Sequence, residues 1–352
     1  MPEWTKGADS KSAKGAILPS GVRIPPPPYK NFLKNPLKKQ KNTKQDILKL
    51  LKENKIISGE KIAKILSISR TAVWKHIKDL KRKGYLIETT PKGYSLIDNG
   101  DLLNEEELAS LPYKVYYYKE VTSTMDIAKE IAEKGEEALI IAETQTKGKG
   151  RMGRFWYSPK GGIWMSLVIK PSFSLKEAYL LTYIASLATA LAIEKIAGIK
   201  VFFKWPNDII CKENDKEKKL AGILLEVKAE IDKIDYAIIG IGINVNNEIS
   251  SFSPEAISLK EILKKELKRK DIIKELIKEF KDLLKMESIK ILNLWKDKSL
   301  TLERNVKIIH PEGEKIGLAL DISDDGALLL KTEDTKILKI YSGDCIHLRN
   351  FL

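Results

Sequence analysis

The chain has 352 residues, 43% of them hydrophobic and 31% charged, which is enough for two or three domains with ordinary buried cores. Its formal net charge of +14 suggests acidic partners such as nucleic acids or nucleotides, although a generally lysine-rich proteome would explain the charge equally well. Two cysteines and three scattered histidines argue against a disulfide framework or a structural zinc site.

Neither a membrane span nor a signal peptide is expected. The longest uncharged stretch, residues 178–193, is shorter than the roughly 20 residues that a bilayer span needs. The N-terminus lacks the apolar core of a signal peptide. We therefore expect an intracellular, cytoplasmic protein.

Residues 1 to about 30 show no helical or strand period and contain four consecutive prolines, and a basic run follows at 34–44. We therefore predict a disordered extension and a basic linker over residues 1–42. Met1–Asp9 and Val22–Pro25 resemble the two ends of a translated transfer-RNA gene, and GTT-CGA-ATC-C would encode the second of them. One hypothesis is therefore that the start codon was placed too far upstream. A genuine disordered tail is the alternative.

Residues 43–98 predict a winged helix-turn-helix domain. A helix begins near Thr43, and Ser58 and Ser69 are suited to cap two more helices. In the third helix, which ends near Gly84, Val73, Ile77 and Leu80 share one face. Two strands follow, near 85–87 and 94–96, around a turn at 91–93.

This domain carries the features of a DNA-binding module. It has 13 Lys and Arg against 6 Asp and Glu, a net charge of +7. The start of the third helix would reach base edges or phosphates in a major groove, with Ser69, Arg70, Thr71, Lys75 and Lys78 as candidate DNA-binding residues. A module for protein contacts, or a solvated basic face, is the alternative. Trp74 is ambiguous between a core position and a backbone contact.

From about residue 113 to 297 the sequence alternates strands and helices, which predicts an α/β (α+β) domain with a mixed sheet. Strands are expected at 115–121, 138–144, 163–169, 201–204, 209–211, 220–227 and 236–244. Helices are expected at 124–134 and 175–196, and 258–297 is helical. Short strands at 302–348, with turns at 311–313 and 324–326, predict a small C-terminal β domain.

The loop Gly148-Lys149-Gly150-Arg151-Met152-Gly153-Arg154 combines backbone freedom with positive charge. Such a loop suits a phosphate or an acyl phosphate, although a flexible basic surface loop looks similar. It is not a Walker loop, because no Gly-Lys-Ser/Thr follows at the required spacing.

A series of motifs resembles the biotin protein ligase family. It runs through Ser123-Thr124, Glu143-Thr144-Gln145, the glycine-rich loop, Trp156, Lys204-Trp205-Pro206-Asn207-Asp208, Lys219-Leu220-Ala221-Gly222-Ile223-Leu224 and Gly240-Ile241-Gly242-Ile243-Asn244. With the winged helix in front, the chain is similar to the bifunctional form, a ligase that is also the biotin operon repressor. The resemblance implies a class II synthetase-like central domain at 113–297 and an SH3-like β-barrel at 302–349.

The resemblance also implies the chemistry and the residues. The expected substrates are ATP and biotin, with Mg²⁺, and the expected product is biotinyl-AMP. Biotin then passes to a lysine of a biotin carboxyl carrier protein. Lys219 and Arg151 are implied as catalytic. The implied biotin-binding residues are Ser123, Thr124, Gln145, Gly148, Lys149, Arg151, Lys219 and Gly222. The implied ATP-binding residues are Arg151, Arg154, Trp156, Asn207 and Asn244, with Asp208 as a magnesium ligand.

Two positions depart from the family pattern. Met125 stands where Asn is common after Ser-Thr, and Lys149 replaces an arginine, which keeps the charge but loses the bidentate fork. Three alternatives stay open at this point: a lipoate-type protein ligase, a regulator that senses biotinyl-AMP without transferring it, and a monofunctional ligase with a vestigial winged helix. Operator DNA and a ligand-bound homodimer are the expected partners of the bifunctional form.

Overall fold

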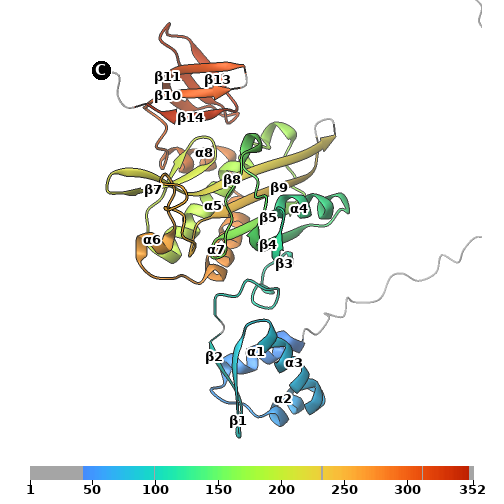
Figure 1. Cartoon of the computed structure of the whole chain (residues 1–352). Coiled ribbons are helices and arrows are strands. Elements are labelled where there is room, and N and C mark those ends of the chain that lie inside the picture. Colours follow the sequence, from blue (N-terminus) through green and yellow to red (C-terminus); the bar gives the residue numbers. More distant parts are fainter. Residues whose placement is uncertain (1–42, 99, 231–232, 311, 349–352) are drawn as a thin grey trace, which may run out of the picture. The chain divides into compact units, whose positions relative to one another are not determined.

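The computed structural model describes residues 43–98, 100–230, 233–310 and 312–348 (Figure 1). The two hypotheses about the N-terminal extension concern residues 1–42, which lie outside the described residues. All elements below belong to the part of the chain from Asn42 onward, which forms one compact unit.

The first elements are the helices α1 (Thr43–Glu53), α2 (Gly59–Leu66) and α3 (Arg70–Arg82), followed by the strands β1 (Leu86–Thr90) and β2 (Gly93–Asp98). As predicted, Ser58 caps α2 by accepting from the Lys61 amide, and Ser69 caps α3 by accepting from the Ala72 amide, both at 3.1 Å. β1 and β2 pair antiparallel as the wing. The winged helix-turn-helix is confirmed, and Val73, Ile77 and Leu80 lie in its buried core.

Trp74, which the sequence left ambiguous, is not a core residue. Its side chain is 52% exposed, and the ammonium of Lys78 lies 5.0 Å from its ring centroid. The apolar face of α3 is already filled by residues at spacings of four and three, so Trp74 faces outward with the cations.

A mixed sheet forms the centre of the described chain, with the order β3-β4-β5-β9-β8-β7-β6. Its strands are β3 (Lys114–Val121), β4 (Ala138–Gln145), β5 (Ile163–Ile169), β6 (Phe202–Lys204), β7 (Asp208–Glu213), β8 (Lys216–Glu230) and β9 (Lys233–Ile243). β3 and β4 pair in parallel, because α4 (Thr124–Glu133) connects them, and the remaining neighbours pair antiparallel.

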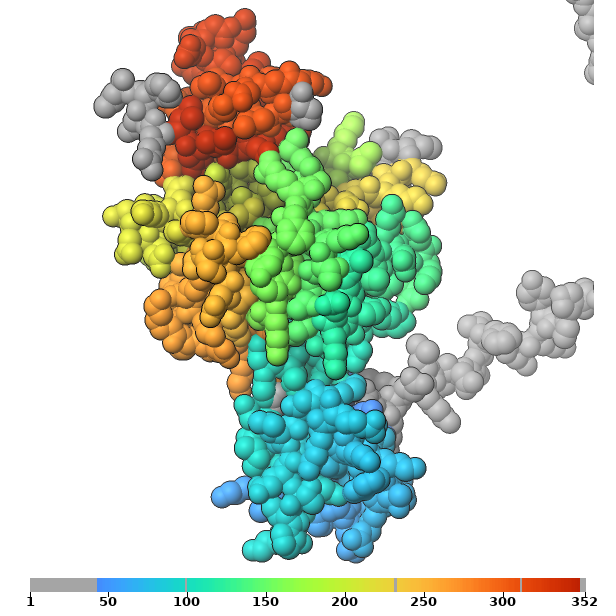
Figure 2. All heavy atoms as spheres, viewed as in Figure 1, coloured from blue at the N-terminus to red at the C-terminus, as the bar shows by residue number. Residues whose placement is uncertain are grey.

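Helices cover both faces of this sheet, so its central strands are apolar on both sides. Ala138 and Ile140 of β4 pack in one cluster with α4, whereas Leu139 and Ile141 pack in another with α5 (Leu180–Ala197). Figure 2 shows all heavy atoms in the same view, with side chains filling the spaces that the ribbon leaves open.

The remaining helices are α6 (Leu259–Leu263), α7 (Arg269–Leu283) and α8 (Ser288–Lys296), with short 3₁₀ helices η1 (Arg151–Gly153) and η2 (Leu175–Glu177). α7 and α8 pack on α5. By length and composition, Leu175–Ala197 alone among the described helices is apolar enough to cross a membrane, but 67% of its most apolar window is buried inside the structure. Its apolarity is therefore explained by its core position.

The C-terminal residues form a five-stranded antiparallel sheet with the order β13-β12-β11-β10-β14 within the described chain. The strands are β10 (Asn305–His310), β11 (Gly313–Ile322), β12 (Leu328–Lys331), β13 (Ile337–Ile340) and β14 (Asp344–His347). Tyr183 of α5 donates from its hydroxyl to the Gly326 carbonyl at 2.9 Å, which ties the turn before β12 to the central domain.

Candidate active site

A cavity of about 420 Å³ lies over the strands β8 and β9. Its walls are the start of α4, the loop 149–156, the turn between β6 and β7, and residues 344–346 of the C-terminal sheet. The volume suits a small organic molecule with part of a nucleotide.

The floor of the cavity is made of glycines, which let an indole lie close to the sheet. Gly222 of β8 and Gly242 of β9 are cross-strand neighbours, and a Cβ atom on either would crowd the ring of Trp156. At Gly242 the added atom would lie 2.6 Å from the indole Nε1. The Trp156 Nε1–H is buried without a hydrogen-bond partner among the described residues, so a donor faces this region and has no acceptor.

One end of the cavity is neutral and polar. Gln145, at the end of β4, accepts from the Thr124 amide at 2.8 Å and from the Thr124 hydroxyl at 3.1 Å. Its amide nitrogen donates to Ser158 Oγ at 2.8 Å, and Ser166 Oγ donates to Thr124 Oγ1 at 2.8 Å. Ser123 is buried and caps α4 by accepting from the Met125 amide at 3.3 Å. These bonds fix the amide of Gln145 in one orientation.

The other end is positively charged. Five cations line the cavity, namely Lys149, Arg151, Arg154, Lys204 and Lys219, against the three carboxylates of Asp208, Glu255 and Asp344. Excess positive charge in a partly enclosed space favours an anionic ligand, and a phosphate or carboxylate is the chemistry that guanidinium and ammonium groups bind best.

Lys219 lies at the centre of this charged end. Its Nζ is 2.7 Å from Asp208 Oδ1 and 5.0 Å from the ring centroid of Trp156. Lys219 lies beside a register shift in the β7–β8 pairing, where Ile210 pairs with Lys219 and Ile209 pairs with Ala221. The ammonium is therefore held by one carboxylate while part of it still faces the cavity, since the side chain is 34% exposed.

The loop cations are held by protein acceptors. Arg151 donates to Asn207 Oδ1 at 3.2 Å and to the Gly343 carbonyl at 3.4 Å, and Arg154 pairs with the carboxylate of Asp344. Burial lowers the pKa of Arg151 from its ordinary value. A desolvated guanidinium gains most from an anionic partner, so a ligand phosphate would compete well for Arg151.

Gly148 is the tightest point of the loop. Its carbonyl accepts from the Trp156 amide at 2.9 Å. A Cβ atom there would lie 2.7 Å from Ser158 Oγ and closer still to the Trp156 carbonyl oxygen. The loop therefore needs glycine at this position for close backbone approach.

We expect Gly148→Ala to raise the KM for the small-molecule substrate about tenfold or more, which corresponds to roughly 1.4 kcal/mol of lost binding. The methyl group would displace the Trp156 carbonyl and Ser158, and this displacement would disturb Gln145. Steady-state kinetics would measure this. Gly150→Ala is the matched control, since its Cβ would approach only Arg154, with the Arg154 carbonyl oxygen nearest at 3.3 Å. Equal KM values for the two variants would contradict this account of Gly148.

The structure brings most of the sequence-predicted residues together around one cavity. Ser123, Thr124, Gln145, Lys149, Arg151, Arg154, Trp156, Asn207, Asp208, Lys219 and Gly222 all line it. Gly148, the first residue of the loop, lines a neighbouring hollow instead. Asn244 is not among the lining residues, because it is buried with its Oδ1 accepting from Asn247 Nδ2 at 3.0 Å.

The candidate sets did not include every residue that lines the cavity, and Lys204, Asp344 and Cys345 are among those they left out. Lys204 lies in the Lys-Trp-Pro-Asn-Asp motif, so its charge was known from the sequence, but the sequence does not show that its side chain faces the cavity. Asp344 and Cys345 come from the C-terminal sheet and carry no local signal. Burial raises the pKa of the Cys345 thiol to about 12, so Cys345 lines the cavity as a neutral group.

A second candidate site is the outer face of α3. Ser69, Arg70, Thr71, Lys75 and Lys78 are all exposed there, around Trp74. The buried face of the same helix holds it on α2 and β1. This arrangement presents a basic helix surface to solvent, as groove binding requires.

Three family models match the chain. The biotin/lipoate A/B protein ligase family matches residues 117–244, a helix-turn-helix domain matches 43–95, and the biotin protein ligase C-terminal domain matches 301–348. The matches fall on the central sheet, the winged helix and the C-terminal sheet.

Two relatives are similar to this chain over most of their length. The chain is 37% identical to the bifunctional ligase/repressor BirA of Bacillus subtilis, over 86% of this chain and 97% of that protein. It is 31% identical to the protein of the same description from Escherichia coli, over 86% and 96%. Among solved structures, biotin protein ligase from Aquifex aeolicus in complex with biotin and ATP superposes with a TM-score of 0.57 at 32% identity, over 67% of this chain and 99% of that one.

Proposed function

The chain belongs to the biotin protein ligase family in its bifunctional ligase/repressor form, and we propose that it activates biotin with ATP, transfers it to a carrier-protein lysine and represses transcription. The proposed division is a DNA-binding domain at 43–98, a catalytic domain at 113–297 and a C-terminal domain at 302–349. We propose that the protein acts in the cytoplasm, where both ATP and operator DNA would be available to it.

The observation that carries the ligase assignment is the cavity with one neutral polar end and one cationic end. Biotin has a ureido ring that needs hydrogen-bond partners, an apolar body and a terminal carboxylate. Ser123, Thr124 and Gln145 would satisfy the ureido group, because a buried polar group without partners is costly. The glycine floor and Trp156 would hold the apolar body, with the carboxylate toward Lys219.

In the first half-reaction the biotin carboxylate attacks the α-phosphorus of ATP, giving biotinyl-AMP and releasing pyrophosphate. Two anions must approach, so cations have to offset their repulsion and stabilise the charge that develops in the transition state. Lys219 would lie between the carboxylate and the α-phosphate. Arg151 and Arg154 would exchange Gly343 and Asp344 for phosphate oxygens, which closes the loop over the adenylate and excludes water.

In the second half-reaction the neutral amine of a carrier lysine attacks the acyl carbon of biotinyl-AMP, and AMP leaves. The mixed anhydride is already activated, so a strong protein base is not required. We assign the role of the loop here to protection of the anhydride until the carrier arrives. The proposed carrier is a biotin carboxyl carrier protein.

Magnesium would bind at Asp208, and its chemistry would be to neutralise phosphate charge during adenylation. Among the described residues there is no group of three His, Cys, Asp or Glu that could hold a metal ion. A single carboxylate is nevertheless sufficient where substrate phosphates supply further oxygen ligands, as magnesium commonly binds. Asp208 would then exchange part of its contact with Lys219 for the ion.

The repressor assignment rests on the exposed cations of α3 together with the relatives described above. Arg70 and Lys75 would contact the backbone or bases of a major groove. We propose that ligand binding favours a homodimer, since two winged helices would match the two half-sites of a symmetric operator.

The ligase assignment is tested by ATP–pyrophosphate exchange. Purified full-length chain with magnesium should catalyse exchange that depends on biotin. Lipoate serves as the comparison substrate, because the matched family includes lipoate ligases. Exchange that depends on lipoate and not on biotin would replace this function with that of a lipoate-type ligase.

A further inference from the structure

Two neighbouring cations at the start of α7 are buried, which is an unusual arrangement. Arg269 and Lys270 are 3% and 4% exposed. Positive charge is disfavoured both by burial and by the N-terminal end of a helix dipole. Each cation is matched by one acid of the segment 100–113, which connects the winged helix to β3. Arg269 pairs with Asp101, and Lys270 pairs with Glu107 at 2.8 Å.

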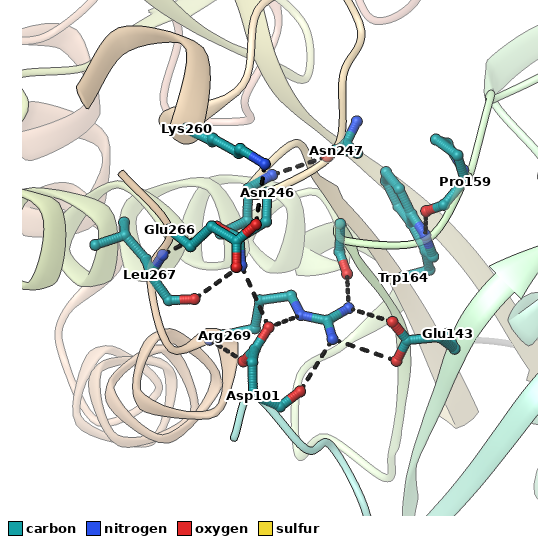
Figure 3. Close-up of polar contacts among 12 residues, drawn as sticks. Asp101, Glu143, Pro159, Trp164, Asn246, Asn247, Lys260, Glu266, Leu267 and Arg269 are labelled. Atoms are coloured by element: carbon teal, nitrogen blue, oxygen red, sulfur yellow. Dashed lines mark hydrogen bonds and ion pairs between the residues drawn. The ribbon is translucent and has the colours of Figure 1, made fainter. Parts of the chain in front are cut away.

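The guanidinium of Arg269 contacts three segments at once (Figure 3). Its Nε pairs with a carboxylate oxygen of Asp101, and Nη2 donates to the Asp101 carbonyl at 3.1 Å. Nη1 donates to the Gly162 carbonyl at 2.9 Å and lies 2.9 Å from Glu143 Oε1. The other Asp101 oxygen accepts from the Arg269 amide at 2.6 Å. A planar guanidinium makes this set of contacts, whereas an ammonium cannot.

One of these partners, Glu143, connects Arg269 to a wall of the ligand cavity, and another, Asp101, connects it to the residues that follow β9. Glu143 lies on β4 two residues before Gln145, the residue that orders the polar end. The side-chain Nδ2 of Asn246 donates to Asp101 Oδ2 at 3.3 Å and to the Leu267 carbonyl at 2.8 Å, as Figure 3 also shows. The backbone amide of Asn246 donates to the Gly161 carbonyl at 2.8 Å. A change in the position of β4 on ligand binding would therefore reach Asp101 through the guanidinium of Arg269.

The second acid continues the network toward the winged helix. Glu107 is 4% exposed and accepts from Lys270, from Lys52 of α1 at 2.9 Å and from the Tyr85 hydroxyl at 3.1 Å. The connecting segment is thus held to α7 at two points, through Asp101 and through Glu107. Glu107 also contacts the DNA-binding domain.

We propose that Arg269 is a positioning residue that couples the ligand cavity to the segment 100–113, so that biotinyl-AMP binding orders this segment and with it the winged helix. This inference rests on the proposed function, because it requires the ligand to bind in the cavity. Ligand contacts with Gln145 restrain β4 and Glu143, and the rigid guanidinium passes that restraint to Asp101. Coupling between two sites requires such a physically connected element.

Hydrogen exchange followed by mass spectrometry tests the coupling in the full-length chain, with and without biotin plus ATP. In the wild type we expect ligand to slow exchange several-fold in peptides from both the loop 147–156 and the segment 100–112. Asp101→Asn removes the charge while keeping size, and should retain slowing in the loop but lose it in the segment. Arg269→Lys should behave in the same way.

Glu105→Gln is the matched control, since Glu105 lies in the same segment but forms its ion pair with Lys83, at 3.6 Å, and not with Arg269 or Lys270. It should respond like the wild type. The inference is overturned if Asp101→Asn keeps the response of the segment, or if the wild-type segment does not respond while the loop does. If the wild-type loop itself shows no response, the proposed function fails and the coupling fails with it.

Discussion

Lys219→Ala should slow the formation of biotinyl-AMP by about 10²- to 10³-fold, the effect typical of removing one preorganised group that stabilises transition-state charge. The Lys219 ammonium lies 2.7 Å from Asp208 and over the ring of Trp156, inside the cationic end of the cavity. Without this ammonium, the repulsion between the biotin carboxylate and the α-phosphate of ATP would be offset less. Quenched reactions separated by chromatography would measure the adenylate directly.

Lys218→Ala is the control for charge. Lys218 is the preceding residue on β8, does not line the cavity, and donates to the Pro254 carbonyl. It should form adenylate at nearly the wild-type rate. Lys219→Arg keeps a positive charge with different geometry, and we expect an intermediate rate. A wild-type rate in Lys219→Ala would show that the central catalytic assignment is wrong.

Operator binding should tighten by about 5- to 150-fold when biotin and ATP are both present, which is the usual range of a coupling free energy of 1–3 kcal/mol. The loop carries exposed apolar side chains, since Met152 is 52% and Phe155 is 58% exposed. Ordering of this loop on biotinyl-AMP would create a surface for dimerisation, and a dimer binds two half-sites.

The measurement is a fluorescence anisotropy titration with a duplex selected from a random library by the wild-type protein with biotin and ATP. Affinity should fall steeply with salt, with a slope that reflects the number of phosphates neutralised. Arg70→Ala should weaken binding with and without ligand. Lys219→Ala should lose only the ligand-dependent part. Equal affinity with and without biotinyl-AMP would remove the repressor function and leave a ligase with a basic domain.

Local patterns in the sequence were sufficient to predict the elements that position the sites. Ser58 and Ser69 signalled two helix starts because a hydroxyl cap and an apolar period occur together. Ile163–Ile169 was predicted to the residue, since a short, mainly apolar run bounded by glycine and proline is typical of a strand buried on both faces. The order of motifs then identified most of the residues that line the cavity.

Features that depend on distant pairing could not be predicted. Asp101 and Arg269 are 168 positions apart, and the residues next to each of them give no sign of the other. Asp344 reaches the cavity only because the C-terminal sheet packs beside it. The sequence did not decide whether Trp74 is buried or exposed, because an aromatic residue on a helix is compatible with both positions. Asn244 is the residue after the end of β9, and its amide oxygen accepts from Asn247 rather than facing the cavity.

The most direct test of the whole account is transfer of labelled biotin to a biotin carboxyl carrier domain by the full-length chain with ATP and magnesium. Intact mass and peptide mapping of the carrier would be measured after the reaction. We predict one biotinyl group on a single carrier lysine, dependent on ATP and strongly reduced in Lys219→Ala. A carrier that stays unmodified with the wild-type chain, under conditions where it accepts biotin from a known ligase, would contradict the account.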